Sequence, residues 1–169
     1  MGDSSTPVER RVGDRLRERG ETVAVAESCT GGLVGSLVTD VPGSSDYFDR
    51  SVVTYSYSAK QDVLAVARET LDDHGAVSEP VAAEMARAVR DTAGTDWGVA
   101  TTGVAGPGGG TPETPVGTVY IAVAHAAPWE TGDSGVDVTH YEFDGDRTTV
   151  KGRIARQALS DLLAAVEAQ

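Results

Sequence analysis

The stretch from Thr22 to Gly32 constrains the fold of this chain more than any other. Its first five residues, Thr22-Val-Ala-Val-Ala26, are small or β-branched and predict a short buried strand. Four polar or small residues, Glu27-Ser-Cys-Thr30, separate that strand from Gly31-Gly32 and a helix predicted to end near Thr39. A strand that turns sharply into a helix presents side chains and free backbone N–H groups at its carboxyl end. The pattern predicts that Ser28 is a nucleophile lying beside an oxyanion hole.

Two other interpretations of this turn stay open. Ser and Thr are also common helix caps, so Ser28 could serve only to begin the helix. Cys29, the one cysteine of the chain, could be the nucleophile instead, although a single small cysteine is more often packed in the core.

The remaining segments alternate between helical and extended patterns. Further helices are predicted from Pro7 to Gly20 and from Ala59 to about Val66, the second with Ser58 as its cap. Another short helix ends at His74-Gly75, and two more begin at Ser78 and at Asp146. Further strands are predicted over 51–57, 97–102, 116–126 and 136–143. Helices between strands, followed by two adjacent strands, predict a three-layer α/β/α sandwich with a mixed, mainly parallel sheet. We find no linker or repeat, so one domain is expected over residues 1–169.

The charge balance limits the classes of molecule that this protein could bind. The net charge is −12, from 26 acidic and 14 basic residues, and Lys60 and Lys151 are the only lysines. Such an acidic surface repels nucleic acid. It is typical of a protein in a salt-rich, halophilic cytoplasm, and the alternative is that this is an ordinary acidic protein. No apolar run reaches the roughly 18 residues of a membrane span. The first residues show neither the basic nor the apolar region of a signal peptide, and one cysteine allows no internal disulfide, so we expect a cytoplasmic protein.

Lys60 follows Thr54-Tyr-Ser-Tyr-Ser-Ala59 and falls in the first turn of a predicted helix. The positive potential at a helix N-terminus disfavours an ammonium group, so the pKa of Lys60 is expected to fall. A neutral lysine accepts a proton from serine in Ser–Lys hydrolases. The alternative is an ordinary solvated lysine.

Two further segments could bind an anion. The loop from Gly103 to Pro115 is rich in glycine, and its backbone N–H groups could close around phosphate or carboxylate, although it matches neither nucleotide-binding glycine motif. Arg147, at the start of the last helix, could form a fork to a phosphate or pair with a neighbouring Asp. The three histidines lie far apart, so no metal site is expected.

Taken together, these stretches resemble the CinA C-terminal domain family, the nicotinamide-nucleotide amidohydrolases. The matching motifs run in the family's order from about residue 7 to 165: Ala26-Glu-Ser-Cys-Thr-Gly-Gly32, Pro42-Gly-Ser-Ser45, Val53-Thr-Tyr-Ser56 with Ala59-Lys60, Glu69-Thr-Leu71, His74-Gly-Ala-Val-Ser-Glu-Pro80, Gly103-Val-Ala-Gly-Pro107 with Gly109-Gly110, Pro115-Val-Gly-Thr-Val119 and Gly145-Asp-Arg147.

The resemblance implies an α/β/α fold and hydrolysis of the carboxamide of nicotinamide mononucleotide to nicotinate mononucleotide and ammonia, within NAD recycling. Ser28 corresponds to the nucleophile and Lys60 to its base, with Tyr55 close by as a possible relay. Backbone groups of Cys29, Thr30 and Gly31 would hold the oxyanion. The substrate-binding positions would be Tyr57, Gly103, Ala105, Gly106, Gly109 and Arg147. No metal or organic cofactor is implied, the partner is a small nucleotide, and the family tends to form homo-oligomers.

The chain departs from the family in two places. Family members commonly read Tyr-Ser-Asn-Glu-Ala-Lys where this chain has Tyr55-Ser-Tyr-Ser-Ala-Lys60, so Tyr57 replaces an amide near the ligand. Larger members carry an N-terminal nucleotide-processing domain for which these 169 residues have no room. Two alternatives therefore stay open: a nucleotide-binding module without turnover, and an amidase for another pyridine or nucleotide amide.

Overall fold

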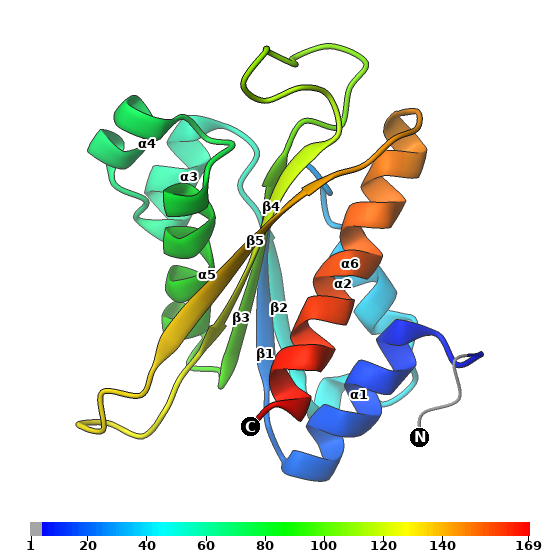
Figure 1. Ribbon diagram of the computed structural model, residues 1–169. Coiled ribbons are helices and arrows are strands. Elements are labelled where there is room, and N and C mark those ends of the chain that lie inside the picture. The colour runs from blue at the N-terminus through cyan, green and yellow to red at the C-terminus, as the bar shows by residue number, and fades with distance from the viewer. Residues whose placement is uncertain (1–4) are drawn as a thin grey trace.

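The computed structural model describes residues 5–169, so the first four residues of the predicted 1–169 domain lie outside it. The elements follow the order α1 (Val8–Arg19), β1 (Val23–Glu27), α2 (Leu33–Thr39), a 3₁₀ turn η1 (Ser44–Asp46), β2 (Phe48–Val53), α3 (Tyr57–Leu64), α4 (Arg68–His74), α5 (Glu79–Ala93), β3 (Trp97–Gly103), β4 (Thr118–His125), β5 (Gly135–Glu142) and α6 (Arg147–Glu167). Helices cover both faces of one sheet (Figure 1), which confirms the predicted three-layer α/β/α sandwich.

The five strands lie in the order β2-β1-β3-β4-β5. β1 pairs in parallel with β2 and β3, whereas β4 is antiparallel to both β3 and β5. Four of the five strands therefore run in one direction and β4 alone runs against them. The predicted mixed sheet is confirmed, with two parallel and two antiparallel strand pairs. Because β1 and β3 are parallel neighbours, their carboxyl ends meet at one edge, where the loop after β3 and the start of α6 also lie (Figure 1).

The two faces of the sheet carry side chains of different size. Along β1, Val23 and Val25 pack toward α1, α2 and α6, while Ala24 and Ala26 pack toward α5, because alternate residues of a strand face opposite sides. The small side chains let α5 approach closely. A Cβ at Gly98 would lie 2.2 Å from the carbonyl oxygen of Ala86, so this position of β3 accepts only glycine.

The boundary between β2 and α3 differs from the prediction. The strand ends at Val53 and the helix begins at Tyr57, whereas the β-rich composition predicted a strand over 51–57. The cap is Ser56, whose hydroxyl accepts the N–H of Ala59 at 3.0 Å, and not Ser58. This capping bond outweighs the β-propensity of Tyr57. Lys60 still lies in the first turn, as predicted.

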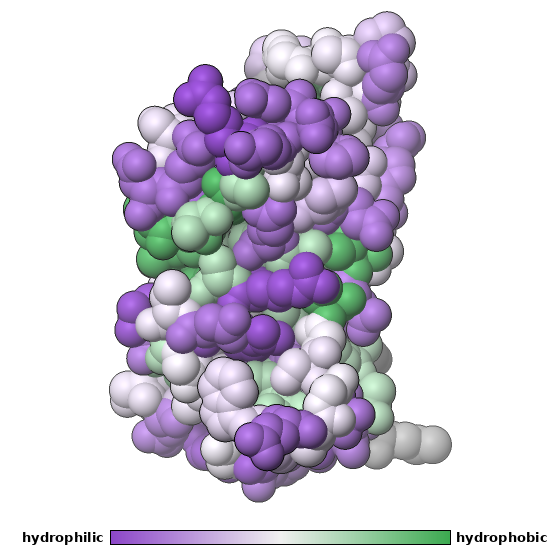
Figure 2. All heavy atoms as spheres, turned by 90° about the vertical axis from the view of Figure 1, so that its left-hand side faces the viewer, coloured by the Kyte–Doolittle hydropathy of each residue, from purple (hydrophilic) through white to green (hydrophobic). Residues whose placement is uncertain are grey.

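One face of the surface is mainly hydrophilic. Figure 2 shows hydrophilic residues over most of the face formed by α3, α4 and α5, with smaller hydrophobic areas between them. Among residues 5–169, no helix combines the length and the apolar character that crossing a membrane would need.

Candidate active site

Ser28 directly follows β1 and is 8% exposed at the bottom of a cavity of about 200 Å³. Its backbone N–H donates to the carbonyl oxygen of Thr101 on β3, at 3.0 Å. The chain then turns through Gly31 and Gly32, whose φ values of 60° and 102° favour glycine, into α2. The predicted strand–turn–helix arrangement thus holds Ser28 at the carboxyl end of the central strand.

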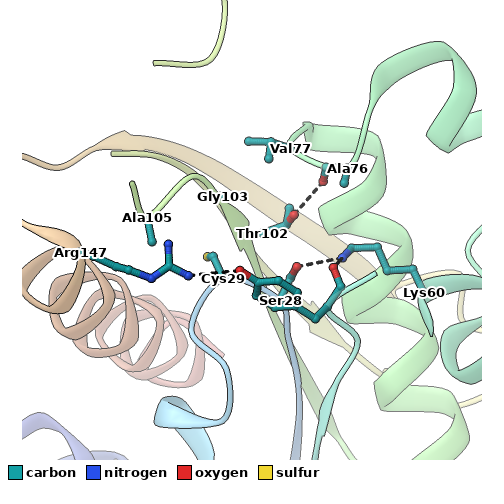
Figure 3. A pocket seen from close by; sticks show the side chains of 10 residues that line it. Ser28, Cys29, Lys60, Ala76, Val77, Thr102, Gly103, Ala105 and Arg147 are labelled. Atoms are coloured by element: carbon teal, nitrogen blue, oxygen red, sulfur yellow. Dashed lines mark hydrogen bonds between the residues drawn. The ribbon is translucent and has the colours of Figure 1, made fainter. Parts of the chain in front are cut away.

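Lys60 reaches Ser28 from α3 (Figure 3). Its Nζ lies 2.8 Å from Ser28 Oγ and 2.7 Å from the backbone oxygen of Thr54. The side chain is fully buried, although it belongs to one of the most water-seeking residue types. Burial lowers the pKa of Lys60 from 10.5 to about 8. A buried amine with a depressed pKa beside a serine hydroxyl has the geometry of a general base.

Cys29 is poorly suited to be the nucleophile. Its thiol is buried within the core cluster. Burial raises the pKa of the Cys29 thiol to about 12, so the reactive thiolate is scarce near neutral pH. Between the two candidates in the turn, the geometry favours Ser28.

The turn leaves two backbone N–H groups for an oxyanion. Among the described residues, the N–H groups of Cys29 and Thr30 have no oxygen acceptor. The prediction for Gly31 is corrected, because its N–H donates to the carbonyl oxygen of Ser28 at 3.1 Å. A negatively charged oxygen formed at the substrate carbonyl could be held by these two N–H groups.

Arg147 enters the cavity from α6, opposite Lys60 (Figure 3). Its Nη1 donates to the carbonyl oxygen of Gly106 at 2.6 Å, and its Nη2 donates to the Tyr55 hydroxyl at 3.2 Å. Lys60 contacts the backbone oxygen of Tyr55, at 3.3 Å, and the structure shows no bond between Lys60 and the Tyr55 hydroxyl for the predicted relay. The guanidinium has five N–H donors, and two of them form these bonds with the described residues, so a bound anion could accept from the others.

A second cavity of about 420 Å³ continues from the first, and Tyr55, Gly103, Ala105 and Arg147 line both. Gly106 and Gly109 line only the second, so the structure places every predicted residue of the Gly103–Pro115 loop at this site. Gly103 also needs its missing side chain, because a Cβ there would lie 2.5 Å from the carbonyl oxygen of Thr118.

Tyr57 lies at the rim of the second cavity and is 52% exposed. Its hydroxyl accepts the N–H of Ala76 at 3.1 Å, while Thr102 donates to the carbonyl oxygen of Ala76 at 2.7 Å. The segment of Ala76 and Val77 is thereby held against both cavities. Sequence reasoning missed Ala76, Val77 and Thr102 as site residues, although His74 to Pro80, which includes the first two, carried part of the family resemblance.

Within residues 5–169, no three His, Cys, Asp or Glu side chains lie close enough together to hold an ion.

Together the fold and the site define a three-layer α/β domain with a buried Ser–Lys pair at the carboxyl ends of its parallel strands. The model of the CinA C-terminal domain matches residues 5–166, and the chain belongs to that family. Among solved structures, a CinA superfamily protein from Klebsiella pneumoniae superposes with a TM-score of 0.88 at 34% identity, over 96% of this chain and 97% of the other. A competence/damage inducible protein from Agrobacterium tumefaciens superposes at 0.84 with 39% identity, over 93% and 92%.

The curated relatives are longer proteins. A CinA-like protein of Chlorobaculum tepidum is 52% identical over 160 residues, which cover 95% of this chain but 37% of the relative. A CinA-like protein of Salinibacter ruber is 47% identical over 161 residues, with 95% and 37% covered. The chain thus spans less than two fifths of the length of these relatives.

Proposed function

We propose that this protein is a nicotinamide-nucleotide amidase, which hydrolyses the carboxamide of nicotinamide mononucleotide through a Ser–Lys acyl-enzyme. The observation that supports it best is the contact of 2.8 Å between Lys60 Nζ and Ser28 Oγ, deep in a cavity. A lysine that only stabilised the fold would not need to be buried beside a hydroxyl and two backbone carbonyl groups, because burying an ammonium group costs free energy.

In the first half of the reaction, neutral Lys60 takes the hydroxyl proton of Ser28 while the oxygen attacks the carboxamide carbon. The N–H groups of Cys29 and Thr30 hold the resulting oxyanion, and each such donor is worth about 3–4 kcal/mol in related chemistry. The C–N bond then breaks, and protonated Lys60 gives its proton to the departing ammonia. An ester of Ser28 with the pyridine carbonyl remains.

In the second half, Lys60 takes a proton from water, and the hydroxide attacks the ester carbon. The bond to Ser28 breaks, Lys60 returns the proton to Ser28 Oγ, and nicotinate mononucleotide leaves. The same two residues therefore serve both halves, and no other proton carrier is needed.

The substrate is inferred from the family resemblance, and two features of the site support it. The two joined cavities give separate room for a reacting amide near Ser28 and for a larger group toward Gly106. Arg147 places a cation between them in a chain of net charge −12. A phosphate-bearing substrate needs such a local positive group, since the overall charge repels it.

The test is ammonia release from nicotinamide mononucleotide, nicotinamide riboside and free nicotinamide, each with wild type and Ser28→Ala. We expect turnover of the mononucleotide above all, and none with Ser28→Ala. Preference for the riboside or another amide would favour the alternative suggested by Tyr57, which replaces an amide of the family pattern. Binding of the mononucleotide without ammonia would indicate a nucleotide-binding module.

We further propose that the protein acts in the cytoplasm as a homo-oligomer. The proposal rests on the single cysteine, the acidic composition and the family tendency. Light scattering of the purified protein would report its mass in solution, and a monomer at micromolar concentration would contradict the second point.

A further inference from the structure

We propose that Glu27 is a positioning residue that builds the oxyanion hole for Ser28, an inference that rests on the proposed function. Glu27 is the last residue of β1 and precedes the nucleophile directly. Its side chain is fully buried, and among the described residues it forms no ion pair. A buried carboxylate without a cation is costly unless hydrogen bonds satisfy it, so its partners define its role.

Five donors converge on this carboxylate. Oε1 accepts from Thr30 Oγ1 at 2.6 Å and from the N–H groups of Gly32 at 3.2 Å and Val34 at 2.9 Å. Oε2 accepts from the N–H of Gly35 at 3.0 Å and from Ser51 Oγ at 2.6 Å. The partners belong to the turn, to α2 and to β2, so one side chain joins three parts of the fold.

The carboxylate replaces the ordinary cap of α2. The cap position is Gly32, which has no side chain, and no side-chain cap bond forms there. Glu27 instead takes the first N–H groups of the helix from the adjoining strand. The close approach requires Gly35, because a Cβ there would lie 2.7 Å from Ser51 Cβ.

This arrangement fixes Thr30 within the turn that follows Ser28. Thr30 gives its hydroxyl proton to Glu27, so Thr101 must donate in the 2.8 Å bond that joins the two threonine hydroxyls. These two bonds fix the Thr30 side chain from both sides, and they hold the turn that carries the backbone N–H groups of Cys29 and Thr30. Neither N–H group has an oxygen acceptor among the described residues. The bonds that Glu27 accepts therefore set where these two N–H groups lie relative to Ser28.

Glu27 also supports the other half of the pair. Its backbone oxygen accepts the N–H of Thr54 at 2.8 Å, and the backbone oxygen of Thr54 accepts from Lys60 Nζ at 2.7 Å. The residue thus lies between the turn of Ser28 and the carbonyl group that holds Lys60.

Whether Glu27→Gln slows or speeds the reaction distinguishes a positioning role of Glu27 from an effect of its charge. A negative charge near the turn disfavours an oxyanion, so removing only the charge would speed its formation. Glu27→Gln removes the charge at nearly constant volume, but its NH₂ group faces donors and leaves at least one N–H without an acceptor. If Glu27 positions the turn, the substitution slows the reaction.

The experiment measures acylation of Ser28 by p-nitrophenyl acetate, which needs the oxyanion hole but not the amide substrate. We expect at least a tenfold slower acylation for Glu27→Gln and a threefold to tenfold loss for Ser51→Ala, with the KM for nicotinamide mononucleotide within threefold of wild type. The matched control is Glu84→Gln. Glu84 accepts from Ala67 N–H at 2.9 Å and from Thr70 Oγ1 at 2.6 Å at the start of α4, so it is a similar cap elsewhere, and its loss should change acylation less than twofold.

Several outcomes would overturn the inference. Glu27→Gln acylated at the wild-type rate or faster, with only a lower melting temperature, would make Glu27 merely structural. If Glu27→Gln does not fold, an unchanged acylation rate for Ser51→Ala would overturn the inference instead. A wild-type protein whose Ser28 is not acylated would also overturn it. A wild type that is acylated in a Glu27-dependent way but releases no ammonia from the mononucleotide would overturn the proposed function and leave this inference standing.

Discussion

Lys60 Nζ donates to the backbone oxygen of Thr54 at 2.7 Å, and this bond fixes how the amine faces Ser28. The backbone oxygen of Tyr55 accepts a second, longer bond of 3.3 Å from the same nitrogen. A neutral amine has two N–H donors and one lone pair. The two carbonyl groups therefore occupy both donors, and the lone pair is left for the Ser28 hydroxyl 2.8 Å away. In the neutral form, the two carbonyl groups therefore direct the lone pair at Ser28.

The first prediction concerns the stability cost of this base. The pKa of Lys60 is about 8 in the folded state against 10.5 ordinarily, so between these values the unfolded state binds more protons. The free energy of unfolding should rise from pH 8 to pH 10, and below pH 8 the full penalty applies, at most about 3 kcal/mol. Lys60→Met should therefore abolish activity and raise the melting temperature at pH 7.

The control for that experiment is Lys151→Met, at the other lysine of the chain, which is only partly buried. Thermal denaturation between pH 7 and pH 10 should show the higher melting temperature at pH 7 for Lys60→Met and not for Lys151→Met. A Lys60→Met variant that is less stable than wild type at pH 7 would show that the buried amine does not carry this penalty.

The second prediction concerns Cys29. Since burial raises the pKa of its thiol to about 12, iodoacetamide at pH 8 should modify the folded protein slowly and leave activity intact. Cys29→Ala should keep at least a third of the wild-type kcat, with a loss of stability of about 1–2 kcal/mol for the small cavity. Rapid inactivation by alkylation, together with an active Ser28→Ala, would reverse the choice of nucleophile.

The third prediction concerns Arg147. Because its guanidinium lies between the two cavities, Arg147→Ala should raise the KM for the mononucleotide at least tenfold and that for the riboside less than threefold. Arg153→Ala is the matched control on the same helix, since that side chain donates to the backbone oxygen of Asp144. Equal effects of Arg147→Ala on both substrates would mean that it only holds Gly106 and Tyr55.

The fourth prediction concerns Tyr57. Tyr57→Phe removes the hydroxyl that accepts the N–H of Ala76, so the segment beside both cavities should loosen. We expect a threefold to tenfold higher KM with kcat unchanged, and a stability loss of about 1 kcal/mol. Steady-state kinetics at fixed pH measure the split. A lower kcat at constant KM would place the Tyr57 hydroxyl in the chemical step instead.

The sequence was sufficient to predict the fold and the turn of Ser28, because both depend on local patterns. Small and β-branched residues from Thr22 to Ala26 favour a buried strand, and Gly31 and Gly32 adopt the positive φ values of the turn into the next helix. The start of α3 was misplaced, since the choice between Ser56 and Ser58 as cap depends on which hydroxyl reaches an N–H.

Contacts between distant segments could not be predicted in the same way. Glu27 is separated from Ser51 by 24 positions, and Arg147 from Tyr55 by 92, so no spacing in the sequence reveals these bonds. The bond between the Tyr55 hydroxyl and Arg147 was not predicted for this reason. The direction of that hydroxyl is set by Arg147, which reaches the site only after the last helix packs against the sheet.

The most direct test of the Ser–Lys mechanism is the pH dependence of kcat/KM for ammonia release, measured for wild type and Lys60→Arg. If Lys60 is the base, kcat/KM should rise with pH through an apparent pKa near 8 and then level off. At pH 7 only about one tenth of such a base is neutral. Lys60→Arg keeps a cation but cannot give up its proton, so it should lose at least about a thousandfold in kcat/KM. A Lys60→Arg variant that hydrolyses the mononucleotide at the wild-type rate would contradict the mechanism.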